Sequence, residues 1–201
     1  MRDGTRRPAA TARDTTLALS VHLTRVDVEP ETRGPGAAPA GPASRPDTVR
    51  PMARLTFEDL AVGPVGTFGP YVVDEAEILD FGRRYDPQPM HVDPAAAGAG
   101  PFGGLIASGW QTGAIGMRLA VDGWLSTLDV IGGTAMDGVR MLRPVRPGDA
   151  LRNAVAVEQL TPGTPPRRGG KVRWSFELTN QDDVVVLRGT TTMLVAGAPE
   201  A

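Results

Sequence analysis

The stretch LIASGWQTGAIGMRLAVD, residues 105–122, decides the fold that we expect. Large apolar side chains recur on two sides of a helix through this stretch, and most other positions are small. One side carries Ile106, Trp110, Ala114, Met117 and Val121, and the other carries Leu105, Thr112, Ile115 and Leu119. A helix that is apolar on all sides is buried. We therefore expect one central buried helix from about Leu105 to Asp122.

The segments on both sides of this helix have the composition of strands. Downstream, we predict strands at 134–145, 149–160, 171–180 and 184–195, and upstream one at 67–73. Within 171–180, Trp174, Phe176 and Leu178 alternate with polar residues, which indicates one buried and one solvated face. The turn sequence NQDD at 180–183 makes the last two strands an antiparallel hairpin. The expected class is α+β, with a single antiparallel sheet wrapped around the central helix.

Two shorter helices are expected between the first strand and the central helix. Asp74 followed by Glu77 is a capping-box pattern, and the helix that it starts carries Ile78, Phe81 and Tyr85 on one face. This helix must end by residue 86, because a proline at 87 disfavours helical geometry in the residue before it. The pair Asp93-Pro94 then marks a second, short helix, with the aspartate as its N-cap.

The first 51 residues differ from the rest of the chain. The run RGPGAAPAGPASRP at 33–46 has no periodicity and almost nothing to bury. We predict a disordered N-terminal extension at 1–51 and one domain at 52–201, and we note that Met52 resembles a natural start. His22 lies in this extension and receives no role.

Composition excludes several classes of function. The 201 residues carry a formal net charge of −2 and no cysteine, so disulfides are excluded and nucleic acid is not an expected partner. The apolar segment 102–121 contains Gln111, Arg118 and five glycines, which argues against a membrane span. With two histidines in the chain, neither a metal site nor a cofactor is expected. No secretory signal is recognised, so a cytoplasmic location is the default expectation.

The stretch YDPQPMH, residues 85–91, gathers polar groups in a stiff loop. Each proline holds the residue before it extended, so Asp86 and Gln88 lose little entropy when the loop orders. Asp86 and His91 are far enough apart to converge on one water molecule, where one group takes a proton while the other gives one. The alternative is that Asp86 ends a helix and His91 simply packs.

Gly109 offers a third chemical group. If the central helix begins just before it, its amide is an unpaired donor at a helix N-terminus and can stabilise a developing enolate. The alternative for Gly109 is close helix packing.

Three segments together resemble the MaoC-like dehydratases, a hotdog-fold family that includes the (R)-specific enoyl-CoA hydratases. They are YDPQPMHVDP at 85–94, PFGGLIASG at 101–109 and RPVRPGD at 143–149, and the match covers roughly residues 55–195. The family motif Asp-x-Asn-Pro-x-His-x-Asp-Pro falls on Asp86 to Pro94. The resemblance implies a hotdog fold, a homodimer whose sheets join, and an acyl-CoA thioester substrate. It also implies that Asp86 and His91 activate water for addition to a 2-enoyl double bond, while the Gly109 amide binds the thioester carbonyl.

The chain departs from the family pattern at three positions. Gln88 replaces the usual asparagine, Ser108 stands where a histidine is common, and Met117 occupies the place of a supporting serine. We assign Gln88, Ser108, Trp110 and Gln111 to substrate binding, with core packing as an equal alternative for Trp110.

Other assignments stay open. Arg140, Arg143 and Arg146 are candidates for CoA phosphate contacts, although an exposed strand face is the preferred interpretation. Two alternatives to a hydratase remain: an acyl-CoA thioesterase on the same fold, and a non-catalytic acyl-CoA-binding protein.

Overall fold

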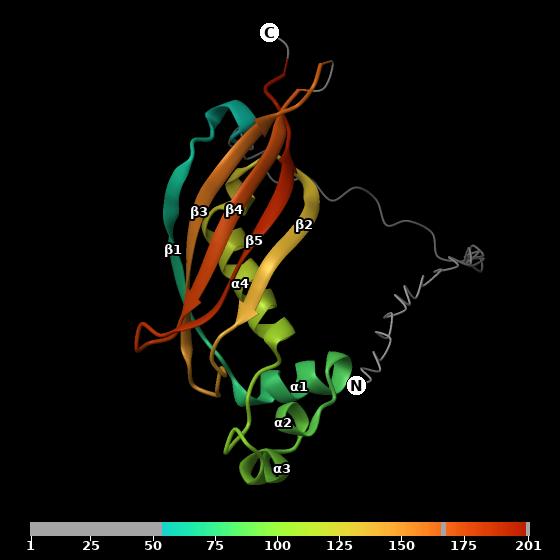
Figure 1. Cartoon of the computed structure of the whole chain (residues 1–201), viewed down its shortest axis with the longest axis vertical. Coiled ribbons are helices and arrows are strands. Elements are labelled where there is room, and N and C mark those ends of the chain that lie inside the picture. Colours follow the sequence, from blue (N-terminus) through green and yellow to red (C-terminus); the bar gives the residue numbers. More distant parts are fainter. Residues whose placement is uncertain (1–53, 166–167, 200–201) are drawn as a thin grey trace, which may run out of the picture. The chain divides into compact units, whose positions relative to one another are not determined.

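The computed structural model describes residues 54–165 and 168–199, so the predicted extension at 1–51 lies outside the described residues. Five strands and four α-helices make up this part of the chain (Figure 1). The strands are β1 (Gly63–Val72), β2 (Val130–Met141), β3 (Ala150–Pro162), β4 (Gly170–Thr179) and β5 (Val185–Val195). The helices are α1 (Glu75–Tyr85), α2 (Pro89–Val92), α3 (Pro94–Ala99) and α4 (Gly109–Gly123).

The strands form one antiparallel sheet in the order β1-β3-β4-β5-β2, and this sheet curves around α4 (Figure 1). The core lies between the two. Along β4, Trp174, Phe176 and Leu178 are buried, while Arg173, Ser175, Glu177 and Thr179 are partly exposed, as the alternation predicts. The α+β class and the sheet wrapped around a central helix are confirmed.

Close contact between α4 and the sheet depends on a glycine. A Cβ atom added to Gly116 would lie 2.7 Å from a methyl group of Leu178, so only a glycine fits without displacement. The fully buried Asn153 of β3 also donates to the Gly116 carbonyl at 2.8 Å. These contacts fix the height of α4 over the sheet.

The central helix begins later than the sequence predicts. Residues 105–108 are not helical, because Ile106 N–H donates to the Met90 carbonyl and Ala107 N–H donates to the Val145 carbonyl. The helix starts at Gly109, after Ser108 as its N-cap. The predicted strand at 134–145 is likewise displaced to 130–141.

The prediction that the central helix is buried on all sides is wrong. Residues on the predicted side of Trp110 and Met117 face outward, and Trp110 is 68% exposed. The sheet covers only one side of the helix, and no other described segment covers the opposite side. Similarly, Tyr85 of α1 is exposed, and the buried face of α1 is formed by Ile78 and Gly82.

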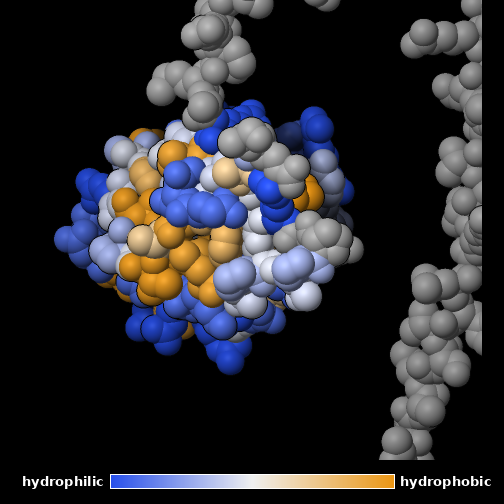
Figure 2. Space-filling model, turned by 90° about the horizontal axis from the view of Figure 1, so that it is seen from above, coloured by the Kyte–Doolittle hydropathy of each residue, from blue (hydrophilic) through white to orange (hydrophobic). Residues whose placement is uncertain are grey.

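The two edges of the sheet differ. The edge strand β1 contains Pro64 and Pro70, which cannot donate a backbone hydrogen bond and so protect an edge from further pairing. The other edge strand, β2, contains no proline and carries the exposed apolar residues Ile131, Met136 and Met141. The free edge of β2 is therefore unprotected. A separate gathering of apolar surface within a hydrophilic border is seen from the upper end of Figure 1 (Figure 2).

No helix among the described residues is both long enough and apolar enough to cross a membrane.

Candidate active site

Three short helices gather at the N-terminal end of α4 and carry the residues of the YDPQPMH stretch there (Figure 1). Asp86 directly follows α1, because the helix ends before Pro87 as predicted. His91 lies in α2, a single helical turn that begins at Pro89 and that sequence analysis treated as loop. A Cβ atom on Gly82 would lie 2.8 Å from the His91 carbonyl oxygen, so α1 and α2 pack without a side chain between them.

His91 is buried, and its ring has a defined orientation. Its Nδ1 lies 2.8 Å from the Ile106 carbonyl oxygen. A carbonyl oxygen can only accept, so Nδ1 carries a proton and Nε2 of the neutral ring carries the lone pair. That Nε2 lies 3.5 Å from Oδ2 of Asp86. The basic nitrogen of the imidazole is therefore directed toward the carboxylate.

Asp86 is held as a carboxylate by two side-chain donors. Ser108 Oγ donates to Oδ2 at 2.7 Å, and Gln88 Nε2 donates to Oδ1 at 2.7 Å. The Ser108 hydrogen bond, followed by that of Gln88, lowers the pKa of Asp86 below its usual value, and a protonated His91 would lower it slightly further. The carboxylate can therefore accept hydrogen bonds at neutral pH.

Ser108 and Gln88 were predicted to bind substrate, but the structure places both on Asp86. Ser108 is buried, and its Oγ also accepts from the Trp110 amide at 3.2 Å as the N-cap of α4. One hydroxyl thus joins the carboxylate to the start of the helix. The sequence pattern alone gave no sign of this bond, which spans 22 positions along the chain.

A cavity of about 320 Å³ opens beside His91 and Gly109, and both residues line it. Met90, Phe102, Met141 and Arg143 contribute further parts of its wall. Asp86 is not part of this lining and reaches the cavity through its contact with His91. As the first residue of α4, Gly109 has an amide without a carbonyl acceptor inside its own helix. The cavity thus holds a basic nitrogen and a backbone donor, with the Asp86 carboxylate in contact with the imidazole.

The segment that builds this site matches a known protein family. The family model described as MaoC like domain covers residues 56–172. The chain belongs to the MaoC-like domain family. YdeM, an uncharacterized protein of Bacillus subtilis, is 32% identical over 143 residues, which are 70% of this chain and 99% of YdeM.

Solved structures agree with this membership. The MaoC-like dehydratase of Rhodospirillum rubrum is 37% identical, with a TM-score of 0.61 over 73% of this chain and 99% of that one. The R-hydratase PhaJ1 of Pseudomonas aeruginosa has a TM-score of 0.56 over 72% of this chain and 88% of its own. At 24% identity, PhaJ1 shows the shared fold alone. The MaoC-like domain is thus a hotdog fold, as the resemblance implied.

A second cavity, of about 250 Å³, lies along α4 on the other side of Gly109. The exposed Trp110, predicted to bind substrate, lines it. Gln111, the other predicted residue, lines neither of these two cavities and is buried with no hydrogen-bond partner for its amide among the described residues. The structure therefore places Trp110 on the second cavity, outside the one that holds His91, and leaves Gln111 outside both.

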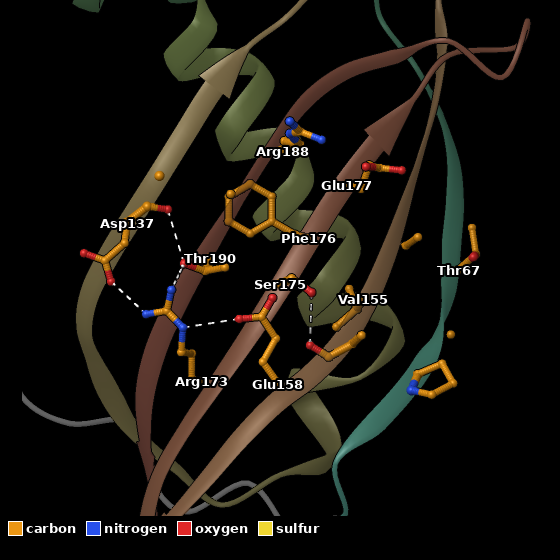
Figure 3. A pocket seen from close by; sticks show the side chains of 16 residues that line it. Thr67, Asp137, Val155, Glu158, Arg173, Ser175, Phe176, Glu177, Arg188 and Thr190 are labelled. Atoms are coloured by element: carbon orange, nitrogen blue, oxygen red, sulfur yellow. Dashed lines mark hydrogen bonds and ion pairs between the residues drawn. The ribbon is translucent and has the colours of Figure 1, made fainter.

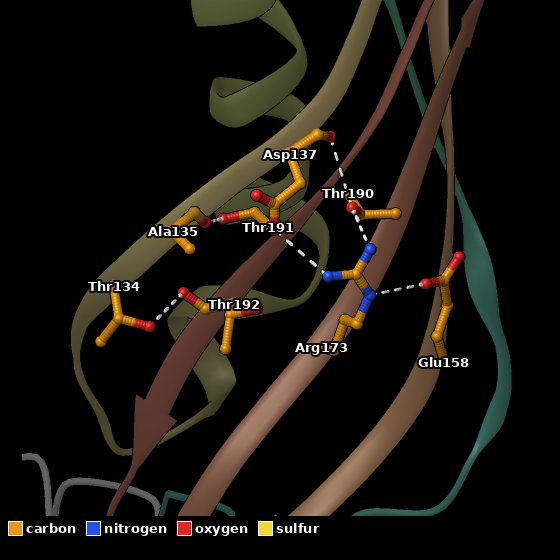
Figure 4. Close-up of polar contacts among 8 residues, drawn as sticks. All are labelled: Thr134, Ala135, Asp137, Glu158, Arg173, Thr190, Thr191 and Thr192. Carbon is orange, nitrogen blue, oxygen red and sulfur yellow. Dashed lines mark hydrogen bonds and ion pairs between the residues drawn. The ribbon is translucent and has the colours of Figure 1, made fainter.

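A wider trough, of about 700 Å³, lies on the face of the sheet opposite α4 (Figure 3). Its central cation, Arg173 of β4, has every donor nitrogen engaged (Figure 4). The guanidinium contacts Asp137 of β2 and Glu158 of β3 at 3.2 Å each, and Thr190 of β5 at 2.8 Å. We interpret this network as a brace across four strands rather than as a site.

The MaoC-like domain has no group of three or more metal-ligating side chains in its described residues. The residue that sequence analysis missed is Met141, which lines both cavities beside Gly109. No sequence signal points to it, because it comes from β2 and meets the start of α4 only in the folded chain.

Proposed function

We propose that this MaoC-like domain interconverts 2-enoyl-CoA and 3-hydroxyacyl-CoA thioesters by adding or removing water. One observation carries the proposal: the lone pair of His91 Nε2 lies 3.5 Å from the Asp86 carboxylate, and His91 shares a cavity with the Gly109 amide. Addition of water β to a carbonyl needs a base, an acid and a donor for the enolate oxygen. The dehydratase of Rhodospirillum rubrum, at 37% identity, supports this class of reaction.

The geometry suggests how water is held. His91 Nε2 and the Asp86 carboxylate are both acceptors, and 3.5 Å is long for a direct charged hydrogen bond between them. A water molecule can donate one hydrogen to each group, which leaves its oxygen lone pair free to attack C3 of the substrate.

The proton and the electrons can be followed through the addition of water. As the water oxygen bonds to C3, its proton passes to the Asp86–His91 pair, and the electrons of the double bond move to the thioester oxygen. The Gly109 amide stabilises that enolate oxygen. The pair then returns the proton to C2, which gives the 3-hydroxyacyl thioester, and the reverse sequence is dehydration.

The CoA moiety would lie at the mouth of the cavity. Arg143 is exposed and lines this cavity. One of its guanidinium nitrogens donates to the Leu142 carbonyl at 2.8 Å, and its other N–H groups can meet a phosphate. Arg146 does not line the cavity, and it donates to the Phe102 carbonyl at 2.5 Å, which fixes that loop. We assign the phosphate contact to Arg143.

The test follows the absorbance of the conjugated enoyl thioester. Crotonyl-CoA should lose this absorbance with the wild-type protein, and Asp86→Asn and His91→Ala should each lower the rate by about 100-fold or more. Asp93→Asn is the matched control, because Asp93 lies two residues from His91 but only caps α3, with hydrogen bonds from Ala95 and Ala96. It should keep nearly full activity.

Two results would reject the proposal. Unchanged turnover in both the Asp86 and the His91 variant would remove the assigned roles. Release of free thiol from acyl-CoA, without loss of the double bond, would instead identify a thioesterase.

We also propose that the active form is a homodimer joined through β2. This edge lacks proline and carries exposed apolar residues, and the uncovered side of α4 lies on the same flank beside Met136 and Met141. Antiparallel pairing of β2 with β2 of a second copy would satisfy the free backbone groups through a two-fold axis.

A further inference from the structure

The two cavities at the start of α4 share part of their walls. Gly109, Met141 and Leu187 line both the catalytic cavity and the cavity along α4. Gly109 belongs to the helix backbone and Leu187 is buried in the sheet. Met141 is therefore the only one of the three with a long side chain that is free to move.

The Met141 side chain lies directly against Gly109. A Cβ atom added to Gly109 would be 2.6 Å from Met141 Cε and 2.9 Å from its Sδ. Met141 is also 54% exposed, at the last position of β2. An unbranched thioether with three rotatable bonds can adopt another rotamer without a shift of the backbone.

The cavity along α4 has the chemistry of a site for an alkyl chain. Its walls contain no charged residue, and on the helix side small residues alternate with the apolar side chains of Trp110 and Met117. The other walls are Met136, Val139, Trp174 and Phe176. A thioester whose carbonyl accepts from the Gly109 amide would carry its acyl chain past Met141 into this space.

We propose that Met141 is the gate that sets acyl-chain length. With its side chain against Gly109, the catalytic cavity ends at Met141 and suits short chains. With the side chain swung outward, the cavity along α4 is added and accepts a longer, unsubstituted chain. This inference rests on the proposed function for its substrate class, but the gate can be tested without turnover.

The experiment compares Met141→Ala, which removes the gate, with Met141→Phe, which replaces it by a rigid ring. Val72→Ala is the matched control, because Val72 is an exposed apolar residue of the opposite edge strand β1 that lines neither cavity. Binding of butyryl-CoA and octanoyl-CoA is followed by tryptophan fluorescence, since Trp110 and Trp174 line the cavity along α4. Hydration of the matching enoyl-CoA chains is measured in parallel.

The ratio of octanoyl-CoA to butyryl-CoA affinity should rise in Met141→Ala and fall in Met141→Phe. Each methylene that newly enters an apolar site is worth about fourfold in affinity, so a rise of about fourfold or more is expected. Val72→Ala should keep the wild-type ratio. The hydration rates should show the same order of chain preference.

The outcomes separate the gate from the proposed function. An unchanged ratio in both Met141 variants overturns the gate, even if crotonyl-CoA is hydrated. A shifted binding ratio without turnover of any enoyl-CoA supports the gate and rejects the hydratase. Absence of octanoyl-CoA binding to Met141→Ala overturns the assignment of the second cavity to an acyl chain.

Discussion

At the scale of single residues, Ser108 joins the Asp86 carboxylate to the start of α4. Its hydroxyl donates to the Asp86 carboxylate and accepts from the Trp110 amide. The resemblance noted above leads us to expect a histidine at this position. The serine found here contacts the Asp86 carboxylate and the start of α4 instead. We infer that Ser108 controls the charge of Asp86.

Replacing Ser108 by alanine should raise the pKa of Asp86, because the largest contribution that lowers this pKa is lost. A lowered native pKa stabilises the fold above the unfolded pKa of about 3.9, and that stabilisation disappears as pH falls through the native value. In Ser108→Ala this stabilisation should therefore be smaller, and its loss should be complete at a higher pH than in the wild type. Carbon NMR titration of the aspartate carboxyl groups measures the shift.

Ser175→Ala serves as the control for this titration. Ser175 lies on the opposite face of the sheet, where its hydroxyl contacts the Ala156 carbonyl. The Asp86 titration should not change in this variant. If the pKa of Asp86 is the same in Ser108→Ala as in the wild type, Ser108 does not set the charge of Asp86 as we infer.

At the scale of helices and strands, local patterns predict most of the fold. The alternation around Trp174 gives β4, and the Asp74 and Asp93 caps give the starts of α1 and α3, each with the predicted side-chain hydrogen bonds. These signals succeed because they depend on neighbours in the chain. The start of α4 was misplaced because non-local hydrogen bonds hold residues 105–108 extended.

The site was predictable only in part for the same reason. Motif spacing predicts the approach of His91 to Asp86, and helix capping predicts the free amide of Gly109. The contact between Gly109 and Met141, and the bond from Ser108 to Asp86, join segments from different elements. Periodicity gives no information on such contacts.

The brace formed by Arg173 permits a prediction about the sheet. Arg173→Met removes contacts to three other strands of the sheet. The side chain is 38% exposed, however, and solvent screens its ion pairs. The free energy of unfolding should fall by about 1 kcal/mol at low salt and by less at high salt. Urea unfolding at both salt concentrations measures this difference.

Arg188→Met is the matched control for the brace. Arg188 lines the same trough, and no ion pair of its side chain is found within the part of the chain that the structure describes. Its replacement should change the unfolding free energy by less than that of Arg173. Equal effects of the two variants would show that the trough surface, and not the brace, is responsible.

At the scale of the whole molecule, new charges on β2 should dissociate the proposed dimer into single chains. Ile131→Glu combined with Met136→Glu places acidic groups on the exposed side chains of β2, and a two-fold axis would bring like charges together. Sedimentation velocity should give twice the chain mass for the wild type and the single chain mass for this variant.

The control carries the same number of new charges near the other edge of the sheet. Val62 and Val72 are exposed at the two ends of β1, and their replacement by glutamate should leave the dimer intact. A wild-type protein that sediments as a single chain would contradict the proposed assembly.

The unequal edges of the sheet also limit how far such pairing can proceed. Once two copies have used their β2 strands, only the proline-bearing β1 strands remain at the outer rims. Those rims are poor templates for another chain, so in the proposed assembly growth would stop at a pair and would not continue into a fibre. The two prolines of β1 would thereby guard the proposed dimer against open-ended association.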